Sequence, residues 1–225
     1  PSIHAATTYY LLNVGVFLFH HGRDELPEQY TEPRLFYTEE YVRDGQGQLI
    51  TNVAVNARRS VFEMQVLARE CWNLREIEAP MIAISDGPLL FWVGKEVPDG
   101  KQLEKDYLGT LVYLHDTQAA MQIIDPALSA SLVGYVDRPT SSFVVSLIHL
   151  LSLEEDEVSR TRLSTNEELE GLSDKPVMFK LLRPGQRSAL FVQQSPQNKR
   201  YHDKGESYEI AFFYLNVGNE LGYHL

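Results

Sequence analysis

The chain has 225 residues, of which 44% are hydrophobic and 23% are charged, and these fractions are ordinary for a folded globular domain. They exclude a disordered chain, a collagen-like repeat and a coiled coil, and no stretch reaches the roughly 18 apolar residues that a membrane span needs. The net charge of −11 repels nucleic acid unless a basic patch or bound metal cations reverse the local field. The single cysteine, Cys71, excludes an internal disulfide framework and multi-cysteine metal sites. We therefore expect a cytoplasmic protein without a membrane partner.

The first part of the chain predicts a buried strand, a loop and a long helix. Residues 9–20 form a continuous apolar run, which is typical of a strand, or a strand pair, buried on both faces. Residues 22–33 are polar with two prolines and predict a loop, and residues 34–41 alternate as an edge strand would. Residues 57–75 predict a helix that Asn56 caps. Its apolar stripe consists of Val61, Met64, Ala68, Cys71 and Trp72.

The rest of the chain alternates predicted strands and helices. An acidic surface excursion is expected near residues 154–174, with a short helix near 167–172. Further helices are predicted at 106–124 and 140–153, and strands at 81–85, 89–93, 131–136, 177–182, 188–193 and 208–217. This order predicts one α/β domain over residues 1–225. Its mixed sheet would contain the runs 9–20, 81–85 and 131–136, with the helices 57–75 and 140–153 beside it.

Carboxylates gather where the first long helix leads into the strand 81–85. Glu63 and Glu70 are two helical turns apart and share a face, and Asp86 follows the strand in an Asp-Gly-Pro turn. Carboxylates so placed can hold Mg²⁺ or Mn²⁺, which take oxygen ligands. Two such ions can clamp the attacking and leaving oxygens of a phosphodiester. The alternative is structural: Asp-Gly is a common turn pair, and Glu63 can pair with Arg59 one turn earlier.

Tyr135 and Arg138 flank the turn after the strand 131–136. The planar guanidinium of Arg138 could brace a phosphate, although a surface arginine and a packed tyrosine explain the same residues. The seven histidines show no metal-binding spacing. The sequence also lacks a Walker A pattern and a Gly-x-Ser-x-Gly elbow, so nucleotide hydrolysis and serine hydrolase chemistry have no support.

Several segments together resemble the NurA nuclease family. They include IAISDGPLLFW around Asp86, VGYVDRPTSSFVVSLIHLL from residue 133, RPGQRSALF from residue 183, and RRSVFE, which ends at Glu63. The resemblance implies an RNase H-like core and a DNA nuclease of the 5′–3′ exonuclease and single-strand endonuclease type. It implies Mn²⁺ or Mg²⁺ held by Asp86 and Glu63, with Tyr135 and Arg138 as further catalytic residues. Glu70 is the fallback ligand, since it shares the helix face of Glu63. The resemblance also implies a homodimer that works with a HerA-type hexameric ATPase in DNA end resection and repair.

Two departures from the family pattern bear on activity. The family's first catalytic aspartate stands in an Asp-Gly-Ser motif shortly before a segment like the one that opens this sequence, which starts at Pro1. At the other end, Glu220 is followed at once by LGYHL, whereas the family has a longer segment. We therefore expect these 225 residues to cleave DNA poorly. The alternative function is a NurA-like scaffold that binds a HerA-type partner without cleaving.

Overall fold

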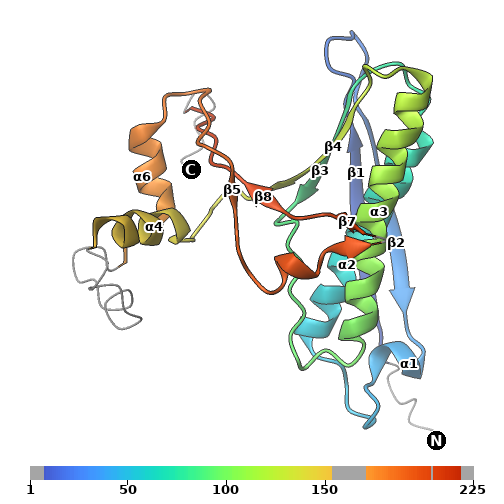
Figure 1. The fold of residues 1–225 in the computed structure, drawn as a ribbon. Coiled ribbons are helices and arrows are strands. Elements are labelled where there is room, and N and C mark those ends of the chain that lie inside the picture. The colour runs from blue at the N-terminus through green and yellow to red at the C-terminus, as the bar shows by residue number, and fades with distance from the viewer. Residues whose placement is uncertain (1–7, 154–170, 204, 219–225) are drawn as a thin grey trace, which may run out of the picture. The chain divides into compact units, whose positions relative to one another are not determined.

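The computed structural model describes residues 8–153, 171–203 and 205–218. The chain divides into two compact units, and each is described by itself. The first unit comprises residues 1–135 and 196–208, and the second comprises residues 136–195 and 209–225. Figure 1 shows the elements of both. The expectation of a single domain stays a prediction.

The first unit opens with an antiparallel hairpin of β1 (Tyr10–Leu18) and β2 (Glu28–Phe36). The predicted loop at residues 22–33 is therefore wrong in its second half, and the predicted edge strand ends at Phe36. Pro33 lies opposite Asn13 within the hairpin. Among the described strands β2 pairs only with β1, so Pro33 lies in an edge strand, where proline is tolerated. The short helix α1 (Glu39–Val42) follows.

The hairpin buries one face, not two. Leu12 and Val14 of β1 are buried, whereas the alternate residues Leu11 and Phe17 are exposed. The prediction that the run 9–20 is buried on both faces is therefore wrong. Side chains alternate along a strand, and only one face of β1 packs against a helix in the described part of the chain.

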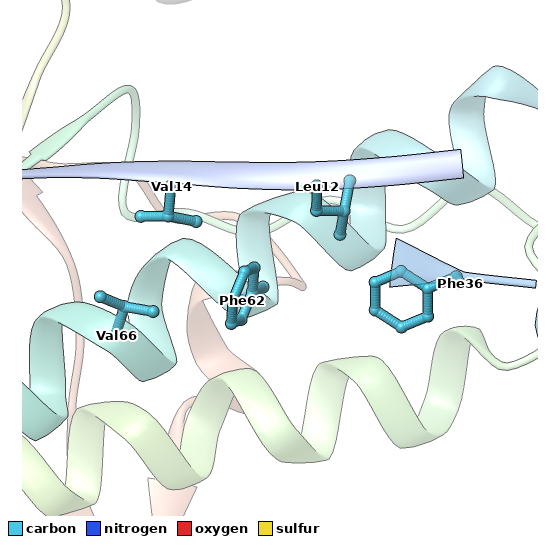
Figure 2. Packing of buried hydrophobic residues seen from close by; sticks show 5 residues of the cluster. All are labelled: Leu12, Val14, Phe36, Phe62 and Val66. Carbon is cyan, nitrogen blue, oxygen red and sulfur yellow. The ribbon is translucent and has the colours of Figure 1, made fainter. Parts of the chain in front are cut away.

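The long helix α2 (Asn52–Asn73) begins one turn earlier than predicted. The hydroxyl of Thr51 accepts the Ala54 N–H at 3.3 Å, so Thr51 is the N-cap and the prediction of Asn56 is wrong. Phe62 and Val66 on α2 meet the buried side chains of the hairpin, as Figure 2 shows. The predicted stripe is confirmed at its first four residues, which are all buried. Burial also raises the pKa of the Cys71 thiol to about 11, as suits a core cysteine.

A second helix and a parallel strand pair complete the first unit's core. Helix α3 (Gly100–Ile124) packs along α2 (Figure 1) and starts six residues before its predicted first residue, 106. Strands β3 (Met81–Asp86) and β4 (Ala130–Tyr135) pair in parallel, and α2 contacts both β1 and β3.

The predicted mixed sheet is instead divided. Among the described residues, β1 pairs only with β2, and β3 pairs only with β4. The α/β class is thus confirmed, while the RNase H-like arrangement stays a prediction. The sequence error has a simple cause: an apolar run specifies burial, but it does not specify which strand pairs with which.

The rest of the first unit is short. It consists of the 3₁₀ turn η2 (Asn198–Arg200) and a small hairpin of β6 (His202–Asp203) and β7 (Glu206–Ser207). No helix in the described part of the chain is long and apolar enough to cross a membrane.

The second unit contains α4 (Phe143–Ser152), α6 (Asp174–Leu181), and the paired strands β5 (Phe191–Val192) and β8 (Ala211–Phe212). The predicted strand at 177–182 is wrong, because this segment lies mostly in α6. Ser173 is its N-cap residue and Pro176 falls in its first turn, where a missing N–H costs nothing. The predicted strands 188–193 and 208–217 are confirmed only as two-residue cores. Most of the acidic excursion, and most of its predicted helix, lies outside the described residues.

The end of that excursion is not at the surface. Asp174 is fully buried, and its carboxylate accepts hydrogen bonds from the Val145 N–H at 2.8 Å and the Tyr214 hydroxyl at 2.7 Å. The Ser141 hydroxyl donates to the same carboxylate at 3.2 Å. Asp174 therefore satisfies a free amide at the start of α4 as well as opening α6.

Candidate functional site

A cavity of about 330 Å³ lies in the first unit between α2 and the segment that follows β3. Glu63 on α2 and Asp86 at the end of β3 both line this cavity. The two residues that the sequence singled out as metal ligands therefore line the same cavity.

The turn after β3 depends on two glycines. Gly87 has a φ of +129°, which side-chain-bearing residues rarely adopt. Its N–H donates to the Tyr135 carbonyl at 2.8 Å, so the turn stays attached to β4. A Cβ at Gly134 would lie 2.5 Å from the Gly87 carbonyl oxygen, so only glycine allows this approach. The Asp-Gly and Gly-Tyr segments of the sequence thus meet at one place.

Burial and the neighbouring Asp86 charge both disfavour the negatively charged form of Glu63 in this cavity. Burial raises the pKa of the Glu63 carboxyl, and the nearby Asp86 charge raises it further. The charge of Arg59 lowers it, and the Arg59 Nε lies 3.5 Å from the Glu63 Oε1. The ion pair with Arg59 that the sequence offered as the alternative is therefore present, but it does not cancel the other two effects.

A divalent cation fits this donor set. Mg²⁺ in proteins is usually bound by one or two carboxylates plus waters and substrate phosphates. Glu63 and Asp86 supply two carboxylates in one cavity, and a cation between them would relieve the effects that raise the Glu63 pKa. Within the described ranges, no group of three or more His, Cys, Asp or Glu side chains could hold a metal ion.

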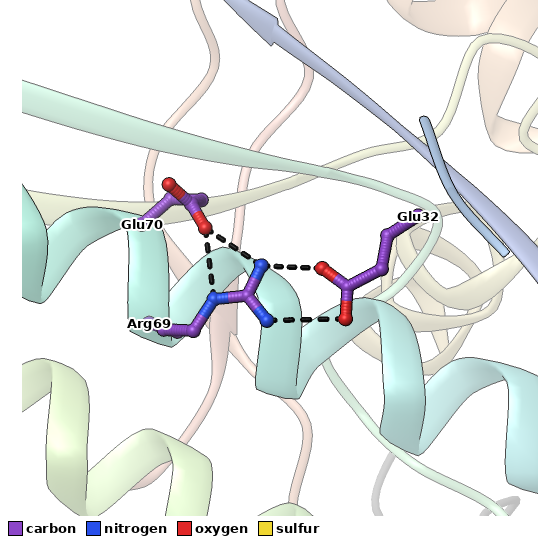
Figure 3. Close-up of polar contacts among 3 residues, drawn as sticks. All are labelled: Glu32, Arg69 and Glu70. Atoms are coloured by element: carbon purple, nitrogen blue, oxygen red, sulfur yellow. Dashed lines mark hydrogen bonds and ion pairs between the residues drawn. The ribbon is translucent and has the colours of Figure 1, made fainter. Parts of the chain in front are cut away.

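Glu70, the fallback ligand, is engaged elsewhere. Its carboxylate accepts from the Arg69 Nε at 2.9 Å and Nη2 at 2.7 Å, and Arg69 also binds Glu32 of β2 (Figure 3). Glu70 is not among the residues that line the cavity. The geometry favours Glu63 over Glu70.

Tyr135 belongs to the first unit, whereas Arg138 belongs to the second. Tyr135 ends β4 directly opposite Asp86 in the parallel register, and its side chain is exposed. Arg138 is exposed and has its Nε 3.5 Å from Asp137 Oδ2. The sequence also predicts that Tyr135 and Arg138 line the same cleft as Asp86. Tyr135 is not among the residues that line the cavity, and for Arg138 this stays a prediction.

The segment after Asp86 carries the residues that the sequence reasoning missed. Residues 89–93 do not form the predicted strand, because side chains bind their backbone instead of another strand. The Phe91 N–H donates to the Tyr201 hydroxyl at 2.7 Å, and the Gln197 side-chain amide donates to the Phe91 carbonyl at 2.9 Å. The Tyr107 hydroxyl donates to the Leu89 carbonyl at 3.0 Å. No local pattern reveals these contacts, since their partners lie 18 to 110 residues apart.

Comparison with known protein families gives one match. The family model described as the NurA domain matches residues 1–222, nearly the whole chain. No significant match was found to a curated protein or to a solved structure.

Proposed function

Because this chain belongs to the NurA domain family, which implies a nuclease associated with DNA end processing, we propose that it is a divalent-metal-dependent deoxyribonuclease. The observation that supports the metal dependence is the cavity that Glu63 and Asp86 share. Both residues line this cavity, and the charge of Asp86 contributes to the raised pKa of the Glu63 carboxyl, which supports placing one cation at both.

In this proposal Glu63 and Asp86 hold Mn²⁺ or Mg²⁺. The bound ion supplies positive charge against the phosphodiester and its developing negative charge. The chain's own residues determine where this happens. Gly87 and Gly134 fix the turn that presents Asp86, and Arg59 balances part of the Glu63 charge until a cation arrives. We keep Tyr135, next to Asp86 in register, and Arg138 as further catalytic residues.

The first test measures metal binding without any activity. A ligand that binds only the folded protein raises its melting temperature. Mn²⁺ should raise the melting temperature of the wild-type chain, and Glu63→Gln or Asp86→Asn should each remove most of that shift. Glu70→Gln is the matched control, because Glu70 lies on the same helix but outside the cavity, and it should keep the shift. An equal shift in all four proteins would refute the assignment.

The second test measures cleavage of single-stranded and duplex DNA by the protein. Mn²⁺ should support cleavage, chelator should stop it, and Asp86→Asn should lower the rate by about 10³-fold, since charge stabilisation is usually the largest catalytic contribution. Metal binding without cleavage would favour the scaffold function instead.

We also propose the partners and setting that the family suggests. These are DNA, a second copy of the chain in a homodimer, and a HerA-type hexameric ATPase, in the cytoplasm. A pull-down with the ATPase, in the presence and absence of DNA, tests that partnership directly.

A further inference from the structure

We propose that Trp92 is the platform on which a nucleobase of unpaired DNA stacks while its phosphodiester lies at the carboxylates of Glu63 and Asp86. This inference rests on the proposed nuclease function, and it adds a residue that fixes the strand. Trp92 lines the same cavity as the two carboxylates, yet 60% of its surface is exposed. In the part of the chain that the structure describes, its indole takes part in no hydrogen bond and no ring contact.

The other tryptophan gives the contrast. Trp72 lies with its ring centroid 5.3 Å from that of Tyr113 and 4.3 Å from the Arg75 guanidinium carbon. Trp72 thus already has an aromatic and a cationic partner within the folded chain. A large aromatic ring with free faces at the wall of a cavity is costly to leave in water, and it is the kind of surface that stacks on a base.

The backbone next to Trp92 is held firmly. Phe91 is buried and stacks on Tyr107, with ring centroids 4.6 Å apart and planes within 11°. The Phe91 N–H donates to the Tyr201 hydroxyl, and the Phe91 carbonyl accepts from the Gln197 side-chain amide. Tyr201 and Gln197 are both buried, so these bonds fix the peptide groups on both sides of Phe91. A ring on a fixed backbone loses little conformational freedom when it binds, so more of the stacking energy appears as affinity.

The charge of the cavity explains why stacking is needed. Its wall contains Glu63 and Asp86 but neither lysine nor arginine. In a chain with a net charge of −11, a phosphate backbone is not attracted to this cavity by basic side chains. A bound cation and an aromatic platform are two attractive elements that this cavity wall can offer to a strand. A base must leave the double helix to stack on a side chain, so this site selects unpaired DNA.

Tryptophan fluorescence tests the proposal, because the chain has only two tryptophans. In Trp72→Phe the only reporter is Trp92, and in Trp92→Phe it is Trp72. Rapid mixing with an oligodeoxythymidylate and Mg²⁺ records binding before cleavage, and anisotropy of a labelled strand records binding independently. We expect quenching in Trp72→Phe and none in Trp92→Phe. If Trp72→Phe fails to fold, the difference between wild type and Trp92→Phe gives the same answer.

Affinity variants complete the test. Trp92→Ala should weaken binding by about tenfold or more, Trp92→Phe should restore most of it, and a strand with an abasic position at the site should bind wild type as weakly as Trp92→Ala binds the intact strand. Tyr37→Ala is the control, since Tyr37 is as exposed as Trp92, at 58%, but does not line the cavity. Binding without Trp92 quenching would overturn the stacking role and leave the nuclease function standing. No binding by anisotropy would overturn both.

Discussion

Two charged side chains on α2, Glu63 and Arg58, differ in how well the fold compensates their burial. Arg58 donates from Nε to Asp99 at 2.9 Å, and from Nη1 to the Tyr10 hydroxyl at 2.9 Å and the Tyr41 carbonyl at 2.6 Å. Glu63 has only the looser ion pair with Arg59 and faces a second carboxylate. Arg58 is therefore a structural cation with several partners, whereas the burial of Glu63 is compensated only in part.

The raised pKa of Glu63 predicts a pH dependence of stability. The folded state holds the Glu63 proton more tightly than the unfolded state, whose pKa is near 4.5. The stability of the folded state therefore falls as the pH rises from 4.5 through the raised pKa of Glu63, and it is lowest above that pKa. In chelator at pH 7, Glu63→Gln should be more stable than wild type, and the difference should vanish below pH 4.5. Because the side chain is 38% exposed, we expect a gain of only about 0.5 kcal/mol in urea unfolding.

The control for that measurement is Glu76→Gln, because Glu76 is largely exposed and paired only with its neighbour Arg75. It should leave the free energy of unfolding unchanged at both pH values. A Glu63→Gln variant that is less stable than wild type at pH 7 would show that the Arg59 ion pair dominates.

Arg58→Ala should destabilise the first unit by about 2–3 kcal/mol, since it leaves the Asp99 carboxylate and the Tyr10 hydroxyl without their partner. Arg58→Lys should recover only part of this, because an ammonium group cannot reproduce the planar fork of donors. Denaturant unfolding of the three proteins measures both effects. A loss under 0.5 kcal/mol, roughly the size of an exposed ion pair, would contradict the structural role.

At the scale of elements, the residue at which a helix begins determines where its side chains lie. Helix α2 begins where Thr51 caps it, so Asn56 lies inside the first turns and lines the cavity. Thr51→Ala should cost about 1 kcal/mol, while Asn56→Ala should be neutral, since alanine is the better helix former. Thermal unfolding of the pair decides between the two caps, and the reverse order of stabilities would restore Asn56.

Asp174 links two helix starts in the second unit. Removing its carboxylate leaves the Val145 N–H at the start of α4 and the Tyr214 hydroxyl unpaired. We expect Asp174→Ala to cost about 3 kcal/mol, and Asp137→Ala, an exposed aspartate, to cost almost nothing. Hydrogen exchange at α4 should rise in the first variant only. Unchanged exchange there would show that α4 does not depend on this cap.

At the scale of the whole molecule, the proposed homodimer is checked most simply by mass. Sedimentation should give about twice the 25.7 kDa of one chain and should shift to the monomer on dilution.

A second whole-molecule property is charge. With a net charge of −11, DNA binding should depend on the divalent cation, and chelator should weaken it even where cleavage is not measured.

The sequence by itself determined the elements whose signal is local. The apolar spacing of α2, the short apolar strands β3 and β4, and the Asp-Gly and Gly-Tyr turns were all readable, because each depends on residues within one or two turns of the chain. The pair Glu63 and Asp86 was predicted from the order of helix and strand and from family resemblance. In the structure both residues line one cavity.

Only the tertiary structure decided which strands pair, which side chains replace a strand partner, and which carboxylate is buried. Residues 89–93 look like a strand, but Tyr107, Gln197 and Tyr201 take their backbone bonds and leave Trp92 at the cavity. Asp174 looks like a surface acid until two helix starts and a tyrosine from elsewhere surround it. These outcomes depend on partners distant in sequence, and a local pattern carries no information about a distant partner.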